Sequence, residues 1–451
     1  MATSEFLQNL LDKEKRTVVD PKNTLEKGIV GVPVFPLFLQ RVLGTDIVTL
    51  NKIIEFAGPT GSGKSALAFY LMKLFIMQGG DAVLVETENK FNPQFFSSIL
   101  GEHADNSVVI PGCTNLEETQ GAILNVVNAL RKSVQSREKE IREWEKSKKK
   151  DKGPRPELVR PVLLVLDSLA VKSRETSESI DKDGHASRAF PVEANLNSAF
   201  YTTLASRLTD IPLTFIYTNH RMKPLVEGNS FTSSKGPEAK SKGGDTPAFY
   251  ASLRLFFEEA GAVKELSNNN WAQGMTCKTI KNSFNQKGTR SSFQMRWTNT
   301  INEDNDLQQV TWFDFESALT DFLAPSNPGF PYDREAVKKF LMVNYHSKTK
   351  YSCKGDIGEF EGNAHEVGAK IGENPEVCWK LSPYLNIRKF NCYPGFDKPY
   401  KPSIEEEVEK EEEPTPAPKK RRGRQKKVVE EVTEESLEEP SFEEEEDASE
   451  E

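Results

Sequence analysis

The sequence has little cysteine, and what it has is scattered. Five cysteines in 451 residues are an odd number, without the paired spacing of a zinc site or a disulfide framework. They are Cys113, Cys277, Cys353, Cys378 and Cys392. We expect free thiols without a chemical role, as is usual in a reducing cytoplasm.

Long apolar runs are also missing. No segment approaches the roughly 18 consecutive apolar residues of a membrane span. The N-terminal stretch MATSEFLQNLLDKEKR carries charges where a signal peptide needs an apolar segment. We therefore expect a cytoplasmic protein with no membrane partner.

Charge is present in quantity but unevenly divided. The formal net charge is −9, yet residues 404–451 hold 20 acidic and 8 basic residues, a net −12, which leaves +3 for residues 1–403. This tail consists of blocks of one sign and is too polar to fold, so we expect it to be disordered. A second charged run lies at residues 131–161, after helically spaced apolar residues. It is either a solvated helical extension or a nucleic-acid-binding arm, and its composition favours the extension.

A phosphate-binding loop stands between an apolar strand at residues 53–57 and an apolar helix at residues 66–77. Its pattern is G-x-x-x-x-G-K-S, which needs this strand and helix around it. The backbone N–H groups of such a loop face phosphates, its lysine neutralises phosphate oxygens and its hydroxyl completes a Mg²⁺ shell. The loop residues are Gly58, Pro59, Thr60, Gly61, Ser62, Gly63, Lys64 and Ser65.

Polar side chains stand at the ends of three further apolar strands. Asp167 ends the run PVLLVLD, whose continuous apolar character is typical of a parallel sheet buried on both faces. Together with the phosphate loop, this acid is expected to hold Mg²⁺. Glu86 and Glu88 follow the strand at residues 82–85, and spacing alone does not decide which of them activates water. Asn219 ends PLTFIYTN, where its amide could sense a γ-phosphate.

Six motifs together resemble the strand-exchange ATPases of the RecA type, and most closely the UvsX recombinases of tailed phages. They are EFAGPTGSGKS, VETENKFNP, LLVLDS, TNHRMK, GGDTPAFYASLRL and CKTIKNSF, spread over about residues 31–300. The resemblance implies an ATP-dependent DNA recombinase of the host bacterial cytoplasm. It would form filaments on single-stranded DNA and pair it with homologous duplex DNA, using ATP and Mg²⁺.

Site residues follow from the same resemblance. Glu88 matches the catalytic glutamate, and Phe95 falls where an aromatic ring packs on adenine. Asn219 stands in place of a glutamine, and the pair formed with His220 is similar to the phage branch. Lys281 matches a lysine that reaches the neighbouring subunit's ATP, whereas Ser283 replaces a second lysine expected there.

The long polar stretch at residues 221–244 corresponds to the second DNA-binding loop of this family. It has almost no apolar residues and is rich in Gly, Ser and Lys, so we expect it to become ordered on DNA. Its candidate phosphate contacts are Arg221, Lys223, Lys235, Lys240 and Lys242. The first DNA loop would lie near residues 177–193, with His185 and Arg188 as weaker candidates.

The expected fold is an α/β RecA-like P-loop core with a mostly parallel central sheet flanked by helices. We assign residues 1–30 to an N-terminal segment that contacts another subunit, 31–315 to the core, 316–403 to a small C-terminal region and 404–451 to the tail. The tail would compete with DNA or bind single-strand-binding and mediator proteins. Its basic block KKRRGRQKK suits minor-groove binding, nuclear import or simple tethering.

Two other functions share many of these features. A hexameric helicase or packaging motor has the same fold, loop and strand-end acid, but the RMK and FYASLRL motifs favour a filament. A recombination mediator that binds ATP without turnover is opposed by the joint presence of Lys64, Asp167 and Glu88.

Overall fold

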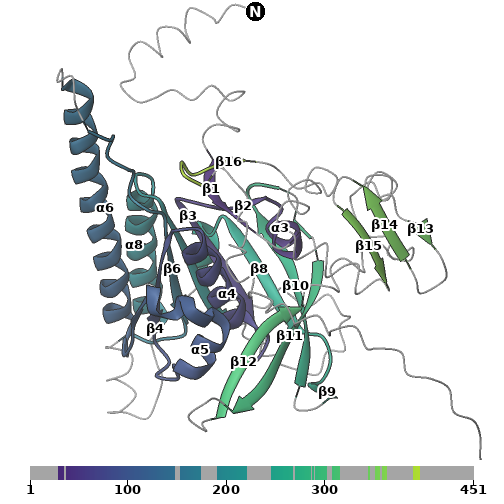
Figure 1. Ribbon diagram of the computed structural model, residues 1–451. Helices are drawn as coiled ribbons and strands as arrows, with labels where there is room; N and C mark the ends of the chain where they lie inside the picture. The colour runs from purple at the N-terminus through teal and green to yellow at the C-terminus, as the bar shows by residue number, and fades with distance from the viewer. Residues whose placement is uncertain are drawn as a thin grey trace, which may run out of the picture. The chain divides into compact units, whose positions relative to one another are not determined.

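The computed structural model describes most of the first 314 residues and short pieces beyond them (Figure 1). The described ranges are 29–34, 37–147, 153–173, 190–220, 245–267, 270–285, 287–288, 290–301, 307–314, 344–345, 351–355, 358–362 and 390–396. The chain divides into two units, Met1–Lys401 and Pro402–Glu451, and every described residue belongs to the first. The expected charged tail, the second expected DNA loop and residues 177–189 of the first lie outside these ranges, whereas residues 190–193 of the first loop begin α8 (Phe190–Leu208). The candidate DNA contacts that lie outside the described residues are His185, Arg188, Arg221, Lys223, Lys235, Lys240 and Lys242.

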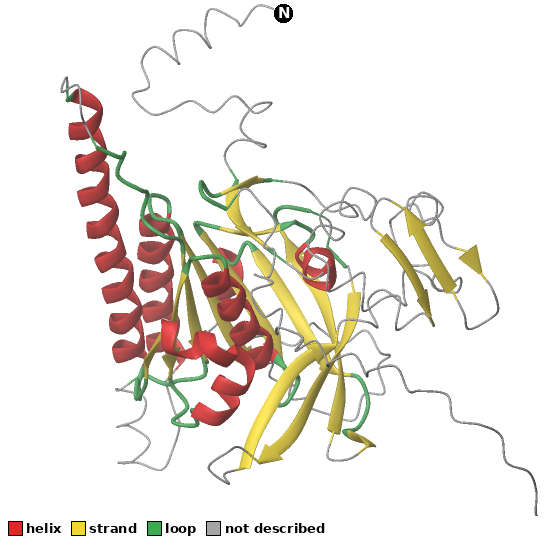
Figure 2. Ribbon diagram, in the orientation of Figure 1, coloured by secondary structure: helices red, strands yellow, loops and turns green. Residues whose placement is uncertain are grey.

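A large sheet forms the centre of the first unit, and its first part is parallel as predicted (Figure 2). Six parallel strands lie in the order β5, β4, β6, β7, β3, β8. They are β3 (Lys52–Gly58), β4 (Asp81–Glu86), β5 (Ser107–Ile110), β6 (Val162–Asp167), β7 (Leu213–His220) and β8 (Leu253–Glu259). Antiparallel strands continue from β8: β10 (Asn270–Asn282), β11 (Arg290–Ile301) and β12 (Leu307–Asp314), with β9 (Lys264–Ser267) beside β10.

Helices cover both faces of the parallel part, because alternate residues of each buried strand point to opposite sides. In β6, Leu163 and Val165 join the cluster with α4 (Lys64–Met77), α5 (Pro93–Leu100) and α3 (Leu37–Leu43). Leu164 and Leu166 join the opposite cluster, with α6 (Leu116–Lys146) and α8 (Phe190–Leu208). The shorter helices are η1 (Gly101–Asn106) and α9 (Asp245–Tyr250). The parallel part of the sheet is thus packed on both faces. Because its strands are parallel, their carboxyl ends lie at one edge.

Helix α6 is much longer than the sheet it covers (Figure 1). Its 31 residues correspond to about 46 Å. Its first half is buried through Ile123, Val127 and Leu130, and the half that follows is charged, as predicted for residues 131–161. Ile141 is buried again in that half, and Trp144 Nε1 donates to the carbonyl of Gly153, in the irregular segment before β6, at 3.2 Å.

Two small sheets complete the described residues. In one, β1 (Val30–Pro33) pairs antiparallel with β2 (Ile47–Thr49) and parallel with β16 (Asn391–Cys392). The other consists of β13 (Asn344–Tyr345), β14 (Tyr351–Gly355) and β15 (Gly358–Gly362). In the part of the chain that the structure describes, no helix is both long and apolar enough to cross a membrane.

Candidate active site

The phosphate loop turns sharply between β3 and α4, and its glycines make the turn possible. Gly61 and Gly63 have φ angles of 80° and 85°, in the left-handed region that other residues rarely adopt. A Cβ atom on Gly58 would lie 2.5 Å from the carbonyl oxygen of Phe257, so the neighbouring strand β8 leaves no room for one. The N-terminus of α4 has no side-chain cap, and its free N–H groups suit an anion.

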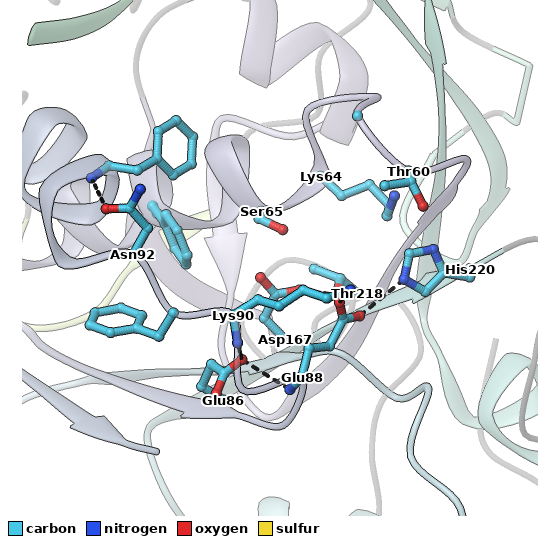
Figure 3. A pocket seen from close by; sticks show the side chains of 14 residues that line it. Thr60, Lys64, Ser65, Glu86, Glu88, Lys90, Asn92, Asp167, Thr218 and His220 are labelled. Atoms are coloured by element: carbon cyan, nitrogen blue, oxygen red, sulfur yellow. Dashed lines mark hydrogen bonds and ion pairs between the residues drawn. The ribbon is translucent and has the colours of Figure 1, made fainter. Parts of the chain in front are cut away.

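Lys64, Ser65 and Asp167 lie together in a pocket beside this loop (Figure 3). Lys64 Nζ donates to the carbonyl of Pro59 at 2.5 Å. Burial lowers the pKa of Lys64, while the charges of Asp167 and Glu88 raise it. Thr60 and Gly61 also line the pocket, whereas Gly58, Pro59, Ser62 and Gly63 are not among its lining residues.

The carboxylate of Asp167 is oriented by two hydroxyl groups. Thr218 Oγ1 donates to Asp167 Oδ1 at 2.5 Å, and Ser65 donates a second hydrogen bond. Burial raises the pKa of Asp167, and these two bonds and the charge of Lys64 offset only part of the effect. A hydroxyl and a carboxylate in contact form the all-oxygen donor set that Mg²⁺ prefers, so the residues fit this ion.

Glu88 lies in the same pocket and its carboxylate has three neighbours. Its Oε1 atom accepts from Ser168 Oγ at 2.6 Å and lies 3.1 Å from His220 Nε2, while Lys90 Nζ lies 3.4 Å from Oε2. Burial raises the pKa of Glu88, but the hydrogen bonds from Ser168 and His220, the charge of His220 and the bond from Lys90 outweigh it. Together they hold the pKa at about 2. Glu88 is therefore an anion at every physiological pH.

Glu86, the other acid after β4, also lines the pocket, but its carboxylate is bonded to the backbone. Its Oε1 atom accepts from the backbone N–H groups of Glu88 and Lys90, at 2.9 and 3.1 Å. The side chain is buried, with 5% exposure. Glu86 thus fixes the turn that carries Glu88, and the choice of Glu88 as the acid that activates water stays a prediction.

Aromatic rings form another side of the pocket. Phe95, which the sequence predicted beside adenine, lines it together with Phe69 and Phe91. The centroids of Phe69 and Phe95 are 6.2 Å apart. Asn92 caps α5 by accepting from the backbone N–H of Phe95 at 3.1 Å, which fixes this ring at the first turn of the helix. The rings of Phe69 and Phe95 are tilted by 60° to each other, and the three rings together offer an apolar wall against which a base can pack.

Asn219 does not line the pocket, contrary to the expectation from sequence. Its side chain is fully buried in β7, and its Nδ2 atom donates to Glu55 Oε1 at 3.0 Å. Glu55 also accepts from Arg254. The next residue, His220, enters the pocket and contacts Glu88 instead. Consecutive strand residues face opposite sides of the sheet, so an offset of one position exchanges their environments.

Lys281 also lies outside this pocket. Its Nζ atom donates to the carbonyls of Ala248 and Phe249, at 3.1 and 2.7 Å, and lies 6.0 Å from the centre of the Phe249 ring. Burial and the charge of Arg254 lower the pKa of Lys281, and Glu55 raises it. The expectation that Lys281 reaches the ATP of a neighbouring subunit stays a prediction.

Six residues that line the pocket were given no site role by the sequence reasoning: Phe69, Lys90, Phe91, Asn92, Thr218 and His220. Ser168, behind the pocket, was missed as well. Lys90 and Phe91 lie in the quoted stretch VETENKFNP, and Thr218 and His220 flank Asn219. The available signal for Lys90, Phe91, Thr218 and His220 was that they lie at or near the carboxyl ends of strands, where the site was expected.

The fold and this site define an α/β protein with a RecA-like P-loop core. No family model matches the chain. It is similar to the mitochondrial DNA repair protein recA homolog of Dictyostelium discoideum, with 24% identity over 279 residues, 61% of this chain and 52% of that protein. It is also similar to DNA repair protein recA homolog 3, mitochondrial, of Arabidopsis thaliana, with 23% identity over 319 residues, 70% of this chain and 65% of that protein. The chain thus spans about half to two thirds of the length of these curated relatives. Both similarities are distant; they support the RecA type and do not single out the UvsX branch.

Proposed function

We propose that this protein is an ATP-dependent DNA recombinase. Subunits assemble as a filament on single-stranded DNA, pair it with a homologous duplex and exchange strands, and ATP hydrolysis loosens the filament. Both relatives are named as DNA repair proteins, which supports a role in repair and recombination. The pair Asn219–His220 is the residue basis for proposing kinship with the phage UvsX branch.

The observation that carries this proposal is the contact between Glu88 and His220, 3.1 Å apart. His220 is the last residue of β7, and residues 221–244 follow it directly. A residue that touches the catalytic acid is thereby joined through the backbone to the expected DNA loop. Binding of DNA at that loop would change the surroundings of Glu88, which is the coupling that a DNA-dependent ATPase needs.

ATP and Mg²⁺ fit the residues of the pocket. The phosphate loop and Lys64 would hold the phosphates, Ser65 and Asp167 the metal ion, and the ring of Phe95 the adenine. Mg²⁺ neutralises charge on the phosphates when bound. Glu88, an anion next to the loop, would accept a proton from the attacking water.

Self-association and DNA are the proposed partners. Lys281, held against the exposed ring of Phe249, would meet the ATP of the next subunit in a filament. Single-strand-binding and mediator proteins are proposed as partners of residues 404–451, whose net charge is −12.

Two measurements on the full chain test the function. Electron microscopy with single-stranded DNA and a non-hydrolysable ATP analogue should show open helical filaments. DNA-stimulated hydrolysis should fall by on the order of 10²-fold or more in Lys64→Ala, because this charge serves both binding and the transition state.

Other outcomes would identify the alternatives. Closed rings in the micrographs would point to a helicase or motor. A parent chain that binds ATP and DNA without turnover would point to a mediator, and a Lys64→Ala variant at the parent rate would refute the enzyme assignment.

A further inference from the structure

Ser168 is a buried residue that the proposed chemistry has not used so far. It follows Asp167 at the end of β6 and is 1% exposed. Its Oγ atom donates to Glu88 Oε1 at 2.6 Å, and the N–H of Ala170 lies 3.3 Å from the same Oγ. Because a hydroxyl has one proton, and Ala170 donates toward its lone pairs, the proton is directed to Glu88.

The backbone of Ser168 is itself fixed to the strand that carries Glu88. Thr87 Oγ1 donates to the carbonyl of Ser168 at 2.8 Å and accepts from its N–H at 2.9 Å. The N–H of Thr87 donates to the carbonyl of Asp167 at 3.0 Å. Three hydrogen bonds therefore join the ends of β4 and β6, and the Ser168 hydroxyl has a fixed position relative to Glu88.

The two oxygens of Glu88 have different surroundings. Oε1 is bound by Ser168 and His220, and the serine is the shorter and more buried contact. Among the described residues, Oε2 is contacted by Lys90 Nζ at 3.4 Å, through a side chain that is 78% exposed. An oxygen that already accepts two hydrogen bonds is a weaker base than one that is free to meet water.

We propose that Ser168 is a positioning residue that holds Oε1 of Glu88, so that Oε2 is the oxygen that takes the proton of the attacking water. The inference rests on the proposed ATPase function. In the step, the water oxygen bonds to the γ-phosphorus, the bond from this phosphorus to the β–γ bridging oxygen breaks, and a water proton passes to Oε2. The products are ADP and inorganic phosphate.

Steady-state ATP hydrolysis with single-stranded DNA tests this role in Ser168→Ala. Loss of one strong hydrogen bond to a charged group should lower kcat about tenfold or more. The KM for ATP should stay within about twofold, because Ser168 does not line the phosphate loop. Ser168→Cys keeps the size of the side chain and weakens the donor, so it should give an intermediate kcat even if the alanine variant folds poorly.

Two controls separate positioning from general loosening. Thr214→Val removes another fully buried hydroxyl, which donates to the carbonyl of Thr49 at 2.9 Å at the other end of the sheet, and should leave kcat unchanged. In a Glu88→Gln background, Ser168→Ala should change the residual rate by less than about twofold, because the acid through which it acts is gone.

The outcomes are distinguishable. Parent-like kcat in Ser168→Ala or Ser168→Cys overturns the inference, and so does an equal loss with and without Glu88. A similar kcat loss in Thr214→Val would show that any buried hydroxyl has this effect and also overturns it. A parent chain that hydrolyses no ATP with DNA overturns the proposed function and this inference together.

Discussion

The sharpest test of the site compares two alanine variants, one at Asn219 and one at His220. Asn219→Ala removes a fully buried hydrogen bond to the charged Glu55, at 3.0 Å, while Arg254 still pairs with that acid. A hydrogen bond to a charged group contributes about 1.5–3 kcal/mol. At about 2–4 °C per kcal/mol for a domain near this size, the Tm should fall by about 3–12 °C.

His220→Ala should have the opposite profile. The imidazole is partly exposed and contacts Glu88 within the pocket, so its loss should change the Tm by no more than about 2 °C. The DNA-stimulated kcat should fall about three- to tenfold, because Glu88 keeps Ser168 but loses its second neighbour.

Thermal unfolding and ATP hydrolysis at a temperature well below both Tm values measure the two effects separately. Each variant serves as the control for the other, because they are consecutive residues of one strand. The reasoning is refuted if Asn219→Ala loses hydrolysis at an unchanged Tm while His220→Ala stays active. That result would mean that the amide of Asn219 acts in the pocket, as the sequence alone suggested.

Three further outcomes are expected. In Gly58→Ala, the new Cβ would meet the Phe257 carbonyl at 2.5 Å, so thermal unfolding should show a loss of about 1–3 kcal/mol and kinetics a raised KM for ATP; an unchanged KM would contradict the packing argument. Since the pKa of Glu88 is about 2 when folded and 4.5 ordinarily, its stabilisation is present above pH 4.5 and is lost as pH falls toward 2. The free energy of unfolding in urea should therefore differ more between the parent and Glu88→Gln at pH 6 than at pH 3. A difference that does not change with pH would refute the lowered pKa of Glu88. Replacing Lys235, Lys240 and Lys242 together with alanine should flatten the dependence of log affinity for single-stranded DNA on log salt concentration by about 2 in slope. An unchanged slope would show that these lysines do not contact the DNA backbone.

The sequence predicted four of the six parallel strands and the phosphate loop between β3 and α4, because their signals are local, whereas β5 and β8 were not predicted. Continuous apolar runs such as residues 162–166 need burial on both faces, and glycines at fixed spacing need a sharp turn. Asp167 was placed correctly at a strand end for the same reason.

The environment of individual side chains was harder to predict. Asn219 and His220 differ by one position along a strand, and only the register with β3 decides which of them faces the pocket. Glu55, Ser168 and Thr218 are common polar residues within apolar segments, and nothing local marks their partners. Their contacts join strands more than 50 residues apart in sequence.

Helix α6 makes the protein suitable for fluorescence tests of the proposed self-association. Arg131 pairs with Asp210 just before β7 begins, so the last turns of the helix lie past the amino ends of the strands, away from Glu88. Ser136 is exposed on these turns, whereas Cys113 and Cys277 are buried; the half-buried Cys392, together with Cys353 and Cys378, would be replaced with serine before labelling. A dye on Ser136→Cys would be carried by a rigid helix, and energy transfer between labelled subunits would report their spacing while the nucleotide pocket stays unmodified.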